Sequence, residues 1–386
     1  MFQPNLIEPV LDEARQQKAK EYAMLRRRLF FGELAIVAIL LLLLVFGGIS
    51  QRLTALLTLP AVPGAALYLV LLLVAYGVLI APLDYYSGFV LPKRYGLSIQ
   101  KFAAWLGDEA KAKGLSLALG AGGVALIYWF IISFPATWWL LGWVVVVLFG
   151  ILLTHIAPIL IVPLFLKMKP LADDELRLRL ERLAERAKTR VRGIYSIEFS
   201  RKGTTANAAL MGLGNTRRIV LSDTLLQKYS PSEIETVLAH ELGHHQHRDI
   251  FRLFAVQSAI WLIGFYVASI ALRASVQAFG YSSMADVAAL PLLFLVAAAF
   301  SALLSPLLNT FSRHVESAAD EYALRLTDDP KSFADAMAKL TDQNLSEAQP
   351  PRWVELLIYD HPSYKNRLEH AKYYSANRFN QQNQGR

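Results

Sequence analysis

Two histidines and a glutamate lie close together in the stretch His240-Glu241-Leu242-Gly243-His244. Residues four apart on an α-helix share a face, so His240 and His244 can both direct a ring nitrogen at one metal ion. Glu241 lies about 100° round the helix, where a carboxylate can take a proton from a water molecule that the metal activates. The pattern therefore predicts a metal-dependent hydrolase. A solvated helix that carries three polar residues is the alternative interpretation.

Two histidines do not complete such a site, because a catalytic zinc ion usually has three protein ligands and leaves a fourth position to water. Glu316 is the predicted third ligand. Asp320 lies four residues later on the same helical face and is placed to accept a hydrogen bond from a ligating imidazole. Taken alone, Glu316 is equally compatible with a solvated helix carboxylate, and His314 is a rival third ligand.

Other histidines lie near the motif and in an apolar segment. His245 and His247 follow the motif directly, but one helical face cannot direct so many rings at one ion, so we interpret them as surface residues or neighbours of the ligands. His155 lies within an apolar segment, where an ionisable residue is a candidate site and a water-facing histidine is the alternative. The chain has no cysteine, so His, Asp and Glu must supply any metal ligands.

The composition is typical of a membrane protein, because 54% of 386 residues are hydrophobic and the mean hydropathy is positive. No cleavable signal peptide is expected, since the first 28 residues are highly charged and the apolar run after them is followed by further spans. About six segments have the length and hydrophobicity of membrane spans. They are Leu29–Ile49, Ala61–Leu83, Leu115–Phe134, Trp138–Leu166 (with Pro158 and Pro163 expected to kink its end), Phe254–Leu272 and Val287–Asn309.

Lys and Arg alternate between the connecting loops. They are abundant before the first span, between the second and third spans and after the fourth, whereas the loops at 50–60, 135–137 and 274–286 contain only Arg52. The positive-inside rule therefore predicts that the N-terminus, the large polar segment and the C-terminus are cytoplasmic. The membrane topology and contact with lipid headgroups then explain the net charge of +8, and we expect no nucleic-acid partner.

The two expected crossings after His244 explain how Glu316 reaches the motif. The spans at 254–272 and 287–309 run antiparallel and return the chain to the side it left, so the helix that begins near Phe311 lies beside the helix of His240. His244 and Phe254 are separated by about 15 Å of helix, so the metal is expected close to the membrane surface or just within it.

Two polar stretches contain the expected peptidase region. A helix is predicted at 173–191, and strands at 195–200, 207–211 and 217–221. Gly212, Gly214 and Asn215 are expected to form a hairpin turn between the last two strands. Ser230 and Glu233 form a capping box that starts the motif helix, which is expected to run on towards the fifth span.

The predicted fold is mainly α: a polytopic membrane helical bundle of about six spans with a cytoplasmic-side zinc metallopeptidase domain that contains a small β-sheet. We divide the chain into a basic cytoplasmic N-terminal arm, four spans, a first peptidase part with the motif helix, two further spans, and a second peptidase part. Their residues are 1–28, 29–166, 167–253, 254–310 and 311–386, respectively.

Besides the H-E-L-G-H stretch, several motifs occur between about Leu83 and the C-terminus. They are Phe89-Val90-Leu91-Pro92-Lys93-Arg94-Tyr95-Gly96-Leu97, Ile156-Ala157-Pro158, Val162-Pro163-Leu164-Phe165, Lys169-Pro170-Leu171, Asn207-Ala208-Ala209, Arg218-Ile219-Val220-Leu221-Ser222-Asp223-Thr224-Leu225-Leu226, Ser312-Arg313 with Glu316 and Asp320, and His361-Pro362 followed by Arg367-Leu368. Together they resemble those of the type I CAAX prenyl proteases, which are integral-membrane zinc metallopeptidases also called farnesylated-protein convertases.

The resemblance implies roles for three further residues. His361 and Arg367 are similar to the pair that contacts the substrate carbonyl and the oxyanion. Asn207 is similar to the family residue on the edge strand beside the site, and such a strand can hold an extended peptide by main-chain hydrogen bonds. Eukaryotic members have seven spans that enclose a chamber, whereas six are expected here, with the first one missing. The long acidic insertion of some animal members is also absent, as in a compact prokaryotic member.

We therefore expect a membrane-embedded zinc endopeptidase with one Zn²⁺ per chain, in the plasma membrane of a prokaryote or the endoplasmic reticulum of a eukaryote. Its expected substrate is a peptide or protein, and the family suggests a C-terminally prenylated C-a-a-X protein. A quality-control protease of the heat-shock type is the alternative. An alternative from another class of protein is a non-catalytic transporter or scaffold with a structural zinc. It is disfavoured because a structural zinc site needs no base such as Glu241, and because the spans are nearly free of the Asp, Lys and Arg residues that a coupled transporter commonly has.

Overall fold

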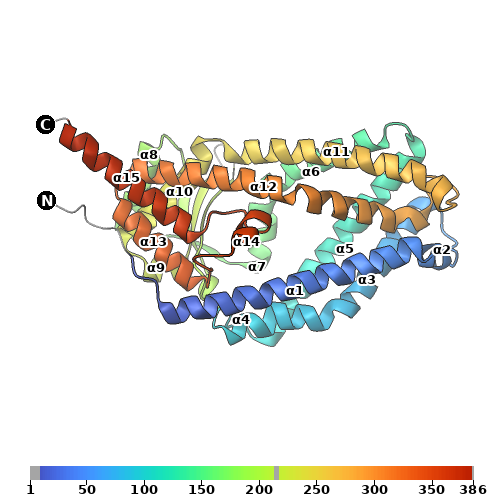
Figure 1. Ribbon diagram of the computed structural model, residues 1–386, viewed down its shortest axis with the longest axis horizontal. Coiled ribbons are helices and arrows are strands. Elements are labelled where there is room, and N and C mark those ends of the chain that lie inside the picture. Colours follow the sequence, from blue (N-terminus) through green and yellow to red (C-terminus); the bar gives the residue numbers. More distant parts are fainter. Residues whose placement is uncertain (1–8, 213–216, 385–386) are drawn as a thin grey trace.

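Long helices form most of the molecule, whose computed structural model describes residues 9–212 and 217–384. Figure 1 shows a bundle of these helices with the sheet and most of the shorter helices towards one end, and α2 at the other. Six candidate spans have the length and hydropathy to cross a membrane, which confirms the predicted architecture. They comprise α1 (Glu13–Phe46), α3 (Ala61–Tyr85) with its continuation to Arg94, α5 (Phe102–Ser133), α6 (Trp138–Ile156), α11 (Asp249–Ala278) and α12 (Leu290–Thr327), which follows a short turn from Val287.

Shorter helices connect the spans and build the peptidase region. They are α2 (Ile49–Thr54), η1 (Tyr86–Val90), α4 (Leu91–Arg94), η2 (Ala157–Ile161), α7 (Val162–Phe165), α8 (Asp174–Arg186), η3 (Phe199–Arg201), α9 (Asp223–Lys228), α10 (Pro231–Gln246), η5 (Val287–Ala289), α13 (Pro330–Gln343), α14 (Arg352–Leu357) and α15 (Tyr364–Gln384). The π-helical turn η2 contains Pro158 and interrupts the expected fourth span after Ile156, because proline cannot donate to the helical ladder.

The basic residues before the first span belong to the same helix as the span. Helix α1 starts at Glu13, and its first turns dock onto the end of α13. Arg15 donates from Nε to the carbonyl of Asp342 at 2.7 Å, and Arg27 forms an ion pair with Glu347 at 2.7 Å. These residues therefore tie the first span to the peptidase region.

A four-stranded sheet lies in the peptidase region, in the order β1-β2-β4-β3. Strands β3 (Ala208–Met211) and β4 (Arg218–Ser222) pair antiparallel, as the predicted hairpin requires. Gly212 has a φ of +87°, while Gly214 and Asn215 lie outside the described residues. Strand β2 (Gly193–Ile197) pairs in parallel with β4, and the unpredicted β1 (Met168–Pro170) pairs antiparallel with β2.

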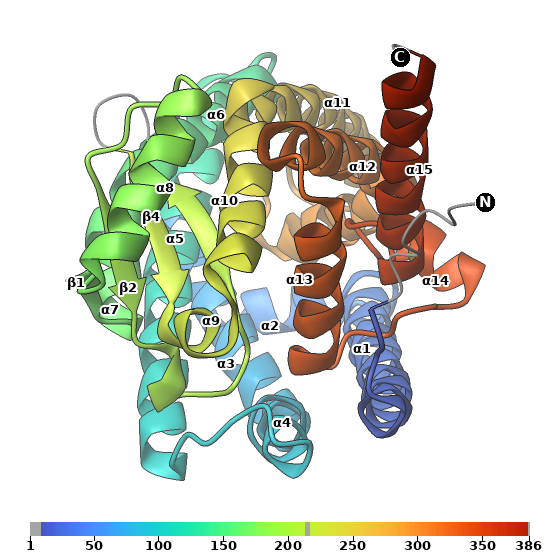
Figure 2. The same cartoon turned by 90° about the vertical axis from the view of Figure 1, so that its left-hand side faces the viewer.

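Helix α10 carries the H-E-L-G-H stretch through the centre of the peptidase region. The predicted capping box is present, since Ser230 Oγ accepts from the N–H of Glu233 at 3.3 Å and Glu233 accepts from the N–H of Ser230 at 2.7 Å. Figure 2 shows α8 and the sheet on one side of α10 and α13 on the other. A Cβ on Gly243 would lie 3.1 Å from Ala319 Cα, so this glycine permits the close approach of α12.

The prediction that the motif helix runs on into the fifth span is wrong. Helix α10 ends at Gln246, and Arg248 adopts a left-handed conformation with φ 58° before α11 begins at Asp249. A residue with this φ cannot continue an α-helix, so the chain turns here. The turn places Asp249 in the first turn of a new helix, next to the site.

Candidate metal centre and active site

Helices α10 and α12 bring three predicted ligands together. His240 Nε2 lies 3.2 Å from His244 Nε2 and 3.3 Å from Glu316 Oε2, and His244 Nε2 lies 3.4 Å from Glu316 Oε1. Ligands about 2.0–2.1 Å from a tetrahedral zinc ion are about 3.3–3.4 Å apart. Each separation therefore has the size of an edge of a zinc coordination tetrahedron, with the two histidines facing different oxygens of Glu316.

The outer nitrogens of both imidazoles face carboxylates. His240 Nδ1 lies 2.9 Å from Asp320 Oδ1, and His244 Nδ1 lies 3.1 Å from Asp249 Oδ2. An ionised carboxylate only accepts hydrogen bonds, so each Nδ1 carries the proton and each Nε2 presents a lone pair to the other ligands. Lone pairs directed at one point are stabilised by a cation there.

The charges around His240 also favour a cation. Burial alone would lower the pKa of His240, but its hydrogen bonds to Asp320 and Glu316 and the charge of Asp320 raise the pKa to about 9. Two nitrogens and a carboxylate oxygen form a donor set that zinc commonly has in hydrolytic enzymes. The residues present therefore fit a zinc ion.

Glu241 follows His240 on α10, and its carboxylate lies near the backbone of Leu210 in β3. Burial raises the pKa of Glu241 against the opposing effect of the neighbouring histidines. A carboxylate whose pKa moves towards neutrality suits general-base chemistry. The packing of α10 against β3 places Glu241 next to the edge strand of the sheet.

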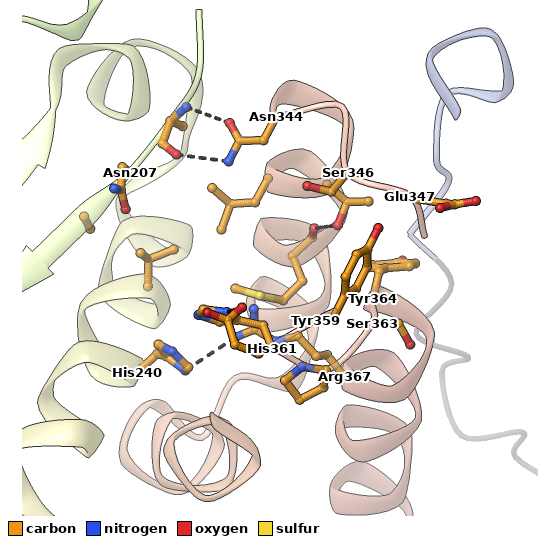
Figure 3. A pocket seen from close by; sticks show the side chains of 18 of the residues that line it. Asn207, His240, Asn344, Ser346, Glu347, Tyr359, His361, Ser363, Tyr364 and Arg367 are labelled. Atoms are coloured by element: carbon orange, nitrogen blue, oxygen red, sulfur yellow. Dashed lines mark hydrogen bonds and ion pairs between the residues drawn. The ribbon is translucent and has the colours of Figure 1, made fainter. Parts of the chain in front are cut away.

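A cavity of about 360 Å³ opens beside His240 and Glu241. Its walls come from the start of β3, from α10, from α13 and from the segment that leads into α15. Figure 3 shows His240, His361 and Arg367 gathered in one part of this pocket and Asn207 and Asn344 in another. The cavity therefore joins the metal centre to the edge of the sheet.

The structure places both His361 and Arg367 beside the ligand group, but against different members of it. His361 Nε2 lies 3.4 Å from Glu316 Oε1, and this side chain is 58% exposed. Arg367 is largely buried: it donates from Nε to Asp320 Oδ2 at 2.8 Å, makes a second bond to Oδ1, and has Nη2 3.4 Å from His240 Nδ1. Arg367 thus holds the carboxylate that orients His240, and both residues line the cavity.

Asn207 lies exposed beside the cavity, just before β3. Both of its main-chain groups are hydrogen-bonded to β4. Its carbonyl accepts from the N–H of Ser222 and its own N–H donates to Ser222 Oγ, both at 2.9 Å. Only its side chain is therefore free to contact a peptide, and main-chain contacts must come from its neighbours.

The remaining histidines are placed elsewhere. His314 Nδ1 bonds to the carbonyl of Thr310 at 2.8 Å, and His155 Nδ1 bonds to the carbonyl of Ile151 at 2.9 Å. The ring of His247 packs against Tyr322, and the structure groups neither it nor His245 with the ligands. The geometry therefore favours Glu316 over His314 as the third ligand.

Asp249 is the residue at this site that the sequence analysis missed. It is 1% exposed and also forms an ion pair with Arg252 at 3.0 Å. The expectation of one continuous helix concealed it, because an unbroken helix would carry residue 249 away from His244. An acidic residue five positions after a ligand histidine was the available indication.

We expect Asp249→Ala to weaken zinc binding by about 10- to 100-fold, because the imidazole of His244 would lose the partner that fixes its proton and ring orientation. Equilibrium competition with a chelator on the purified protein measures this effect. Asp174→Ala is the control, since Asp174 is 81% exposed on α8. Equal zinc affinity in the two variants would contradict the assignment.

A bundle of membrane-spanning helices that carries an H-E-x-x-H helix and returns a glutamate to it defines a membrane-embedded metallopeptidase. The model of peptidase family M48 matches residues 170–375, and the model described as CAAX prenyl protease N-terminal, five membrane helices, matches residues 2–167. The chain belongs to peptidase family M48 and is a metalloendopeptidase, which removes the transporter and scaffold alternative. Within residues 9–167 we find four candidate spans, one fewer than that description states.

Relatives extend over most of the chain. The uncharacterized metalloprotease YhfN of Bacillus subtilis is 30% identical over 92% of this chain and 84% of its own length. CAAX prenyl protease 1 of Saccharomyces cerevisiae is 31% identical over 78% of this chain and 70% of its own. The crystal structure of S. mikatae Ste24p matches 96% of this chain and 91% of its own with a TM-score of 0.83 and 26% identity.

Proposed function

We propose that this metalloendopeptidase uses zinc held by His240, His244 and Glu316 to cleave C-terminally prenylated C-a-a-X proteins. The observation that carries the proposal is the cavity that joins Glu241 and His240, one of the three grouped ligands, to the edge of the sheet. The similarity to proteins named CAAX prenyl protease 1 over more than two thirds of their length supports the substrate class.

Zinc at this site would polarise the scissile carbonyl and acidify a water molecule. Glu241 receives the proton of the attacking water and returns it to the leaving amine. His361, exposed towards the cavity, donates to the developing oxyanion. Arg367 adds a fixed positive charge nearby while it holds Asp320 in place. The side chain of Asn207 contacts the bound peptide at the edge of the cavity.

The active site faces the cytoplasm in this proposal. The distribution of Lys and Arg among the loops supports this orientation. The beginning of α1, the peptidase region and α15 lie at the same end of the bundle in Figure 1. This arrangement is required if all three lie on the same side of the membrane.

A membrane-protein quality-control protease is the second candidate, and the two differ in what they require of the substrate. We expect a farnesylated C-a-a-X peptide to be cleaved more efficiently than the same peptide without the lipid. A competition assay with both peptides in one reaction, quantified by mass spectrometry, measures the ratio of kcat/KM directly. A ratio near one would reject the prenyl requirement and favour quality control, while zinc-dependent cleavage itself would stand.

A further inference from the structure

Strand β3 is the last strand of the described sheet, and one of its edges faces the cavity. Main-chain groups alternate between the two edges of an antiparallel strand. Because Asn207 directs its N–H and carbonyl to Ser222, Ala206, Ala208 and Leu210 direct theirs to the opposite edge. This edge is where an extended peptide can add as a further strand.

Asn344 occupies the start of this edge. It caps α13, and its side-chain amide accepts from the N–H of Ala206 at 2.9 Å and donates to the carbonyl of Ala206 at 3.1 Å. These are the two bonds that a residue of a neighbouring strand would make. Figure 3 shows this pair of bonds beside Asn207. A peptide cannot pair with Ala206 while Asn344 is there.

The catalytic base lies towards the other end of the same edge, because α10 packs against β3, and Glu241 lines the cavity with Ala208 and lies near the backbone of Leu210. Between these two positions, Ala208 has no partner at this edge among the residues that the structure describes. Leu210 and Ala206 are four residues apart, which is about 13 Å of strand. An extended peptide with its scissile bond beside Glu241 therefore has room for about three residues before it reaches Asn344.

The direction of the peptide follows from the sheet. Strand β3 pairs antiparallel with β4, and antiparallel pairs outnumber parallel ones by roughly two- to threefold. A peptide antiparallel to β3 runs from the Met211 end towards Ala206, so its C-terminal residues point at Asn344. The blocked end of the edge then lies on the side of the leaving fragment.

We infer that Asn344 is a specificity-determining residue that limits the leaving fragment to about three residues. By filling the hydrogen-bonding positions of Ala206, it selects substrates whose cleavage site lies close to the C-terminus. The inference rests on the proposed function, because it assumes hydrolysis beside Glu241. It deepens that function by giving a structural reason for cleavage near a chain end.

The test compares two peptides with the same sequence up to the scissile bond, one with three residues after it and one with eight. The wild-type protein is expected to prefer the short peptide, and Asn344→Ala is expected to reduce that preference by about tenfold, because the main chain of Ala206 becomes available to the longer peptide. Gln343→Ala is the matched control. Its Nε2 bonds to the Thr204 carbonyl at 2.6 Å, so this change also loosens α13 from the β3 segment but leaves Ala206 blocked.

Two readouts separate specificity from simple loss of structure. A purely structural role would lower kcat/KM for both peptides equally, and an unchanged ratio in Asn344→Ala would overturn the inference, as would a wild-type protein without length preference. Asn344→Ser replaces the alanine variant if that variant does not fold. The length preference is measured separately with prenylated peptides and with unprenylated peptides, and also as binding of the peptides to the Glu241→Gln protein. A lack of length preference can therefore be distinguished from a lack of prenyl preference and from a lack of cleavage.

Discussion

Glu241→Gln is expected to lower peptide cleavage by about 10²- to 10⁴-fold while the protein keeps its zinc. Glutamine has the shape of glutamate and can occupy the same position near the backbone of Leu210, but it cannot act as a base towards water. The ligand atoms of His240, His244 and Glu316 are unchanged by the substitution. Cleavage rates under single-turnover conditions and metal content of the purified protein measure the two effects separately.

Glu235→Gln is the matched control for this experiment. Glu235 lies on the same helix, where its side chain is 21% exposed and pairs with Arg179. This variant should retain full cleavage, because the paired carboxylate is outside the cavity. Activity of Glu241→Gln comparable to that of Glu235→Gln would sink the general-base mechanism, and loss of zinc from Glu241→Gln would assign this carboxylate to the metal instead.

Arg367→Met is expected to destabilise the protein by about 3–5 kcal/mol, because it leaves the carboxylate of Asp320 buried without its cationic partner. Asp320 is 0% exposed, and Arg367 makes two hydrogen bonds to it. Thermal unfolding in a single detergent measures the loss as a lower Tm. The combined Asp320→Asn, Arg367→Met protein should lose less than the two single changes together, since neither charge is then left alone.

Arg325→Met provides the comparison for Arg367→Met. Arg325 forms an ion pair with Glu321 one turn away on α12, and the two side chains are 69% and 57% exposed. Such exposed pairs contribute about 0.3–0.5 kcal/mol, so this Tm should stay close to that of the wild type. If both arginine variants unfolded at the same temperature, the structural role of Arg367 would be untenable.

The sequence was sufficient to predict about six spans and the proximity of His240, His244 and Glu316. Hydropathy over about 20 residues is a strong local pattern, and the motif spacing placed His240 and His244 on one helical face. The third ligand Glu316 needed topology, because 72 residues separate it from His244. Two consecutive antiparallel spans made that separation interpretable.

Contacts that depend on tertiary packing could not be predicted. The three-residue strand β1 is too short to show an alternating pattern. The left-handed turn at Arg248 has no glycine or proline to mark it, so Asp249 was overlooked. Asn344 lies 138 residues from Ala206, and nothing in either local sequence indicates that an amide fills the edge of a strand.

Helix α12 (38 residues in all) continues from a membrane span to Glu316 and beyond, with Pro306 in its interior. Helix α11 carries Asp249 in its first turn and then crosses the same membrane. Glu316 and Asp249, the partner of His244, are therefore carried by membrane-spanning helices. The tilt of such helices adjusts to the thickness of the bilayer. A displacement of α12 by one residue is about 1.5 Å, nearly half of a coordination edge. We therefore expect the thickness of the lipid or detergent layer to influence the position of Glu316 relative to His240 and His244.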